Sequence, residues 1–249
     1  MSAMASLTAM DGVTTANGVS GVASGAGAAG GGEDLVAGRV LPTRTELATV
    51  LPWSGLRRGS TVAVHESFSV LFSLLAEATS RGSWAAAVGL PGLGVVAAAE
   101  AGVEVSRLAL VPRPGSHPVG VLAALLDGVD LVAVGGTQQL AEPDARRLSA
   151  RARHRGSVLL PFGPWPGADV QLRCAQARWR GAEAGHGHLR EREVTVRASG
   201  RGAASRPRSC RLALPAPGGG VDVASGADPA SASGSVVPLR PVPGASRSS

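Results

Sequence analysis

The feature that most constrains the fold is a repeated alternation of short apolar runs with helical patterns between residues 61 and 162. The run "VDLVAV" at 129–134 shows no polar–apolar alternation, which is typical of a strand buried on both faces. The repetition predicts an α/β fold with a mostly parallel sheet and helices on both of its faces. The expected strands are 61–65, 84–89, 108–112, 129–134 and 157–162, and the expected helices are 67–80, 92–102, 117–128 and 142–155.

The pattern changes after Pro166. Segments 168–181, 189–199 and 208–215 alternate polar and apolar residues more clearly than the earlier runs. Such alternation is typical of strands with one solvated face. We therefore expect antiparallel strands added to the edge of the parallel sheet.

The two ends of the chain have a different composition from the middle. Residues 1–40 are rich in Gly, Ala, Ser and Thr, and residues 216–249 are similar with added prolines. Segments of this kind bury too little apolar surface to offset their backbone entropy. We expect both to be disordered and the folded domain to span 41–215. The N-terminus lacks the pattern of a secretory signal, and no apolar run approaches the roughly 18–20 residues of a membrane span, so a cytoplasmic location is predicted.

The stretch "STVAVHESFSVLFSLLAEA" at 60–78 places a strand, a tight connection and a helix where a P-loop nucleotidase holds its phosphates. A P-loop needs glycine-bearing turns, a lysine and a Ser or Thr. Here Glu66 and Phe68 stand in the connection, and Ser67 is a plausible cap of the helix. All 24 basic residues of the chain are arginine, so a Walker lysine cannot be present.

The other positions of a nucleotidase site also lack the residues that such a site requires. The strand 129–134 leads into Gly135-Gly136-Thr137, without the aspartate that holds Mg²⁺. The strand 84–89 leads into "GLPGLG" (89–94), which has neither the spacing nor the acidic partner of a dinucleotide fingerprint and indicates a tight strand-to-helix turn. We therefore predict no ATPase activity, no catalytic residue and no cofactor.

Metal and thiol chemistry have little support. His186 and His188 in "HGH" lack further ligands at a fitting spacing, so no metal site is predicted. Cys174 and Cys210 form neither a CxxC motif nor a disulfide framework, and are expected to be two ordinary thiols.

Positive charge is concentrated in one part of the chain. Residues 146–211 hold 15 Arg against 4 acidic residues, whereas residues 1–145 hold 7 Arg against 12 acidic residues. In the helix 142–155, Arg147, Arg151 and Arg155 share one face by their i, i+4 spacing, with Leu148 and Ala152 facing the core. One interpretation is a surface for DNA phosphates or an acidic partner. The other is a solvated helix whose arginines complement its dipole. The candidate binding residues are Arg146, Arg147, Arg151, Arg153, Arg155, Arg201, Arg206 and Arg208.

Several segments resemble RecA-type recombinases. "LPWSGLRRGSTVAV" is similar to the segment that enters the P-loop, "AGVEVSRLALVPRPG" to a helix end and the strand after it, and "ALLDGVDLVAV" to the helix and strand of the Walker B motif. "LRCAQARWRG" and "REREVTVRASGR" resemble the antiparallel strands after the second DNA-binding loop. The resemblance covers 41–215 and implies a RecA-like fold that lacks the Walker residues.

A degenerate RecA-like chain of this length most resembles the actinobacterial ImuA-type proteins. The segment "GRGAASRPRSCRLALP" also resembles the C-terminal segment of that family. That family belongs to the mutasome of the SOS response to DNA damage. The resemblance implies a non-catalytic adaptor in translesion synthesis and mutagenesis. Its implied partners are an ImuB-like homologue of Y-family polymerases, an error-prone DnaE-type polymerase, RecA itself and DNA, with no membrane. Two alternatives stay open: a basic DNA-binding accessory protein of recombination or repair, and a SulA-type inhibitor of cell division.

Overall fold

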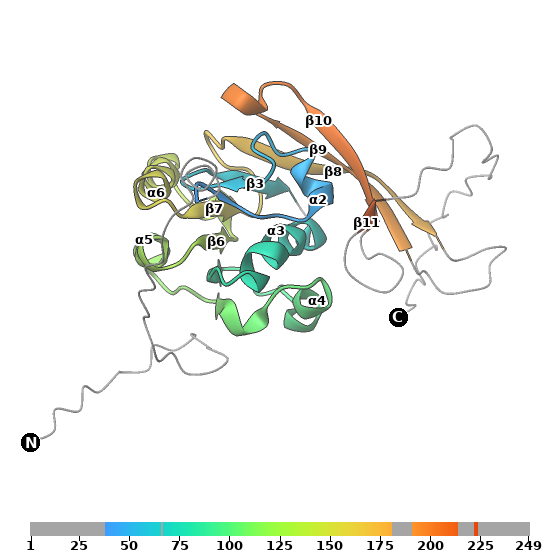
Figure 1. Ribbon diagram of the computed structural model, residues 1–249. Coiled ribbons are helices and arrows are strands. Elements are labelled where there is room, and N and C mark those ends of the chain that lie inside the picture. The colour runs from blue at the N-terminus through green and yellow to red at the C-terminus, as the bar shows by residue number, and fades with distance from the viewer. Residues whose placement is uncertain (1–37, 66, 181–190, 214–221, 224–249) are drawn as a thin grey trace, which may run out of the picture.

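The structure is a computed structural model that describes residues 38–65, 67–180, 191–213 and 222–223 (Figure 1). It confirms an α/β fold with parallel strands, helices on both faces and antiparallel strands that follow them in sequence.

Four parallel strands form the centre of the molecule, in the spatial order β5, β4, β6, β7. Their burial patterns contain almost only buried residues, as expected for strands covered on both sides. Two isolated parallel bridges, Thr61 to Leu159 and Val64 to Phe162, join β7 to β3. The strand bounds are β3 Val62–His65, β4 Ala85–Val88, β5 Leu108–Val111, β6 Leu131–Val134 and β7 Val158–Pro161.

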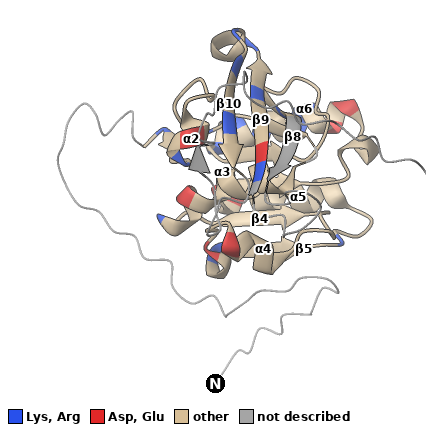
Figure 2. Cartoon of the chain, turned by 90° about the vertical axis from the view of Figure 1, so that its right-hand side faces the viewer, with Lys and Arg blue, Asp and Glu red and all other residues tan. Residues whose placement is uncertain are grey.

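The antiparallel strands continue from β3. Strand β8 (Val170–Arg180) is parallel to β3, and β9 (Glu191–Gly200) and β10 (Arg208–Ala213) follow it in antiparallel pairing. The ladder between β8 and β9 is irregular between Ala175 and Arg178. In Figure 2 the strands β8, β9 and β10 lie side by side, above the region of β4 and β5.

The helices divide between the two faces. On one face, α3 (Phe68–Ser80) and α4 (Val95–Glu100) contribute to a core cluster that also contains Val62, Val64 and Leu172. On the other face, α5 (Pro118–Gly128) and α6 (Glu142–Arg155) pack with alternate residues of the same strands. Leu148 and Ala152 of α6 are buried there, as their spacing predicts. Short elements complete the chain: β1 Val40–Leu41, α2 Thr45–Ala48, β2 Leu56–Arg57, and the 3-10 turns Val105–Arg107, Thr137–Gln139 and Gly202–Ala204.

The ordered structure extends slightly beyond the predicted bounds of 41–215. Val40 lies in β1, which pairs with β2, and β11 (Asp222–Val223) pairs with β10. Assigning these three residues to disordered tails was wrong, because such two-residue pairings rest on backbone hydrogen bonds that an apolar pattern does not reveal. The rest of the predicted tails lies outside the described residues, apart from Gly38 and Arg39. Among the described helices, none combines the length and apolarity needed to cross a bilayer.

Candidate functional site

Strand β3 ends at His65, and helix α3 begins at Phe68 after a short connection. Ser67 is the N-cap of α3, and its Oγ accepts a hydrogen bond from the backbone N–H of Val70 at 3.4 Å. The predicted cap is thereby confirmed. It satisfies one of the free N–H groups that a phosphate would otherwise use. Glu66 of this connection lies outside the described residues.

Aromatic rings stand in front of this helix. Phe68, the first residue of α3, stacks on Phe162, with 4.4 Å between ring centroids and an interplanar angle of 19°. Phe72 lies 6.0 Å from Phe68 on the next turn. Phe162 directly follows β7, and its N–H donates to the carbonyl of Val134 at 2.7 Å. Phe68 at the start of α3 is therefore packed against two further apolar rings, and such rings offer no compensation for the desolvation of a phosphate.

The ends of β4 and β6 approach each other closely. A Cβ atom on Gly135 would lie 2.2 Å from the carbonyl oxygen of Gly89, so only glycine fits at position 135. Gly89 has a φ of 65°, and Gly94 is the N-cap of α4. The segment 89–94 is therefore a tight strand-to-helix turn, as predicted.

A cleft of about 470 Å³ opens at the carboxyl ends of β4, β5 and β6. The cleft lies beside β4, where the helices change from one face of the sheet to the other. Helix α4, which follows β4, packs on one face, whereas α5 and α6 pack on the other. Ligands of open α/β sheets bind at such positions. Among the described residues its lining holds no carboxylate, imidazole or thiol, so it offers contacts for binding rather than groups for acid–base chemistry. The lining consists of Val88, Gly89, Pro91, Pro112, Arg113, Pro114, Gly115, Pro118, Leu122, Val134, Gly135, Gly136, Gln139 and Leu140.

No group of three or more potential metal ligands occurs within the described part of the chain. The "HGH" segment at 186–188 lies outside the residues that the structure describes. Cys174 and Cys210 are both free thiols, half-buried on the core side of β8 and β10. Burial raises the pKa of Cys210 to about 11, so this thiol stays protonated and unreactive near neutral pH.

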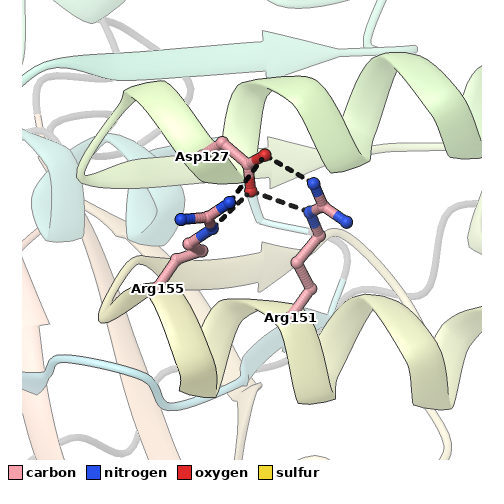
Figure 3. A network of polar contacts seen from close by, with 3 residues as sticks. All are labelled: Asp127, Arg151 and Arg155. Atoms are coloured by element: carbon pink, nitrogen blue, oxygen red, sulfur yellow. Dashed lines mark hydrogen bonds and ion pairs between the residues drawn. The ribbon is translucent and has the colours of Figure 1, made fainter.

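Two of the predicted helix arginines converge on one carboxylate. The Nε atoms of Arg151 and Arg155 on α6 donate to Oδ1 of Asp127 on α5, at 2.8 and 3.0 Å (Figure 3). The hydrogen bond from Arg151, helped by the hydrogen bond from Arg155 and by both positive charges, lowers the pKa of Asp127. These two guanidinium groups therefore bridge α5 and α6, and the single carboxylate compensates half of their charge.

The other helix arginines also have acidic neighbours. Arg146 pairs with Glu142 one turn earlier, and Arg147 lies 3.3 Å from Asp144. Arg153 reaches Asp169 at 3.9 Å. Because all of these side chains are largely exposed, the pairs contribute little to stability. They do reduce the positive field that the helix presents.

The remaining predicted arginines follow β9 in the chain. Arg201 donates to the carbonyl of Gly167, and Arg208 donates to the carbonyl of Leu51 at 3.4 Å. Arg206 is exposed in the loop before β10. Arg153 and Arg201 therefore meet at the segment 167–169, whereas Arg208 lies against Leu51.

Three arginines that the sequence reasoning did not select lie together on the sheet. Arg173 of β8 is directly opposite Arg197 of β9, and Arg211 of β10 lies opposite Thr195, two residues along β9. All three are exposed. The alternation in "LRC", "VRA" and "CRL" was the signal that could have found them, because it places each arginine between residues of the opposite face.

The fold is α/β, with a serine cap and stacked aromatic rings at the start of α3. Residues 49–167 match the family model described as the MT3502 N-terminal domain. The chain is also 45% identical over 106 residues to the uncharacterized protein Rv3395c of Mycobacterium tuberculosis. That alignment covers 42% of this chain and 52% of the relative, so the chain spans about half the length of the relative it matches. The family match includes the parallel strands and ends before β8.

Proposed function

We propose that this protein is a non-catalytic, RecA-like adaptor of the ImuA type that acts in DNA-damage-induced mutagenesis and translesion synthesis. The observation that carries the proposal is the stack of Phe68 on Phe162 at the N-terminus of α3, in a chain without lysine. A helix N-terminus that binds phosphate presents its N–H groups to the anion. Here a serine cap and two apolar rings take that place, while the surrounding sheet is intact.

The arrangement of the sheet supports the RecA-like part of the proposal. Strand β3, which would enter the P-loop, is an interior strand between β7 and β8. The antiparallel strands β9 and β10 follow the parallel ones, as the resemblance implies. The interval between Gly136 and Ser157 holds one short turn and the single helix α6, leaving little room for long loops.

As an adaptor, the protein would act in the cytoplasm, at the nucleoid, with the ImuB-like polymerase homologue as its first partner. A DnaE-type polymerase and RecA are the further partners. Since adaptors act through their surfaces, an exposed apolar surface is the feature to test first.

Helix α4 offers such a surface. Its sequence "VVAAAE" is apolar over five of six positions, and Val95 and Val96 are 41% and 72% exposed. Within this helix only Ala98 is buried. A helix that is apolar on nearly all sides is usually covered by other structure. We therefore assign α4 as the contact for the ImuB-like homologue.

Substituting Val96→Asp is expected to weaken the complex with the ImuB-like homologue at least about tenfold, because it places a charge in the apolar contact. Affinity is measured by titration calorimetry or by quantitative pull-down with purified proteins. The control is Ala124→Asp, which adds the same charge to an exposed position of α5. The surface assignment is wrong if both variants bind like the wild type. The adaptor proposal itself is wrong if the wild-type chain binds neither that homologue nor the DnaE-type polymerase nor RecA.

A further inference from the structure

The outer face of strands β8, β9 and β10 is polar and basic. In this sheet Leu172, Val196 and Leu212 point into the core cluster shared with α3. The residues between them therefore point to the opposite side. Beside Arg173, Arg197 and Arg211, that side carries Gln171, Thr195, Ser199 and Ser209. We call it the arginine face.

The three arginines are neighbours in the strand register. Residues directly opposite in an antiparallel pair have Cα atoms about 4.5–5.5 Å apart, which applies to Arg173 and Arg197. The diagonal neighbours Arg197 and Arg211 are separated by about 7–8 Å. Like charges on directly opposite residues, such as Arg173 and Arg197, are destabilising.

Compensation within the protein is weak on this face. Among the described residues, no carboxylate lies within ion-pair distance of Arg173, Arg197 or Arg211. Arg173 has only a long contact of 3.4 Å with the Gln171 amide oxygen. Glu193 belongs to the same face and is the other diagonal neighbour of Arg211, two residues along β9 from Thr195, so it is the carboxylate nearest in register to the three arginines. On α6, by contrast, each arginine of the predicted set has an acidic neighbour within ion-pair distance.

The composition of the face indicates what it would bind. Guanidinium, hydroxyl and amide groups are the side chains that contact phosphate and sugar in nucleic-acid complexes. Protein partners usually need buried aromatic or aliphatic anchors, and the described part of this face has only alanines as apolar residues. Aromatic rings for stacking bases are likewise absent from the residues described on it, so single-strand readout by stacking is not favoured.

We propose that the arginine face binds the phosphodiester backbone of duplex DNA, without sequence preference, through Arg173, Arg197 and Arg211. The proposal is independent of the adaptor function, because it uses a different surface from α4 and a region outside the family match at 49–167. Under this proposal the surface that contacts DNA is the sheet and not helix α6.

The test compares two triple variants of the full chain that lose the same charge. One is Arg173→Ala, Arg197→Ala, Arg211→Ala, and the other is Arg147→Ala, Arg151→Ala, Arg155→Ala. Binding to a fluorescent 30-base-pair duplex of mixed sequence is followed by anisotropy between 50 and 200 mM NaCl. Three lost phosphate contacts should reduce the slope of log K against log salt by about 2.7, so that the affinity of the wild type falls about 40-fold more over this range than that of the sheet variant. The α6 variant should keep a slope close to that of the wild type.

Several results would overturn the proposal. They are a sheet variant that binds like the wild type, an α6 variant that loses as much as the sheet variant, and wild-type binding to polyglutamate as tight as to DNA of equal charge. The last would identify an acidic protein as the ligand. Thermal melting checks that both variants fold. If the alanine variant of the sheet does not, the corresponding triple Arg→Gln variant removes the same charges while keeping long polar side chains on the strands.

Discussion

Gly135→Ala is expected to lower the free energy of unfolding by about 3 kcal/mol, at the upper end of the usual cost of overpacking. The added Cβ would lie 2.2 Å from the carbonyl oxygen of Gly89 and 2.7 Å from Cδ2 of Leu90. Both strand ends are held in place, since Gly135 donates to Val88 and Gly89 donates to Val111. Neither backbone can move away without breaking these hydrogen bonds. Urea denaturation followed by circular dichroism measures the change.

Gly120→Ala is the matched control for this substitution. Gly120 lies in α5, and a Cβ atom there would meet no atom within 4 Å. Because Gly120 lies in the first turn of α5, where the advantage of alanine in a helix interior applies only in part, the substitution is expected to change stability by less than about 1 kcal/mol. If Gly135→Ala were as stable as the control, the close approach of β4 and β6 that shapes the cleft would be wrong.

Trp165→Ala is expected to cost about 3–5 kcal/mol of stability, the usual range for deleting a buried aromatic side chain. Trp165 is only 4% exposed, in the connection between β7 and β8. Its Nε1–H donates to the Oγ of Ser149 on α6 at 2.9 Å, and the hydroxyl of Thr61 donates to the same Oγ at 3.1 Å. The substitution would therefore leave a cavity at the point where α6, β3 and β8 meet. Urea denaturation again measures the change.

Trp84 provides the comparison, because it is 37% exposed and its ring faces the guanidinium of Arg107 at 5.6 Å. Trp84→Ala removes the same atoms from a solvated place and should cost no more than about 1 kcal/mol. Equal effects of the two tryptophan substitutions would contradict the buried position of Trp165.

The parallel half of the fold could be predicted because its signals are local. Continuous apolar runs, the Ser67 cap and the glycines at 82, 102 and 156 mark where elements begin and end. Strand order could not be read from the runs, since it depends on which strands pair over long separations. The short strands β1 and β11 carry too few residues for any periodic pattern.

The features of the candidate site also divide into those that could be predicted from the sequence and those that could not. Sequence reasoning identified the missing lysine and the blank Walker positions, because these are properties of single residues. It placed Arg151 and Arg155 on one helix face, but it could not foresee that Asp127 from α5 would lie between them. Nor could it foresee that Phe162, 94 residues after Phe68, would stack on that ring. Pairings of this kind arise only when the helices and strands come together.

The central claim is that the start of α3, with its stacked rings, does not bind nucleotide. A measurement of nucleotide binding tests this claim most directly. Thermal unfolding of the full chain is measured with and without millimolar ATP and Mg²⁺. A ligand at 100 times its Kd adds about 2.7 kcal/mol of stability, and this corresponds to a rise in Tm of about 5–10 °C for a domain of this size. We expect no change in the Tm of the protein. A rise of several degrees that depends on nucleotide would contradict it.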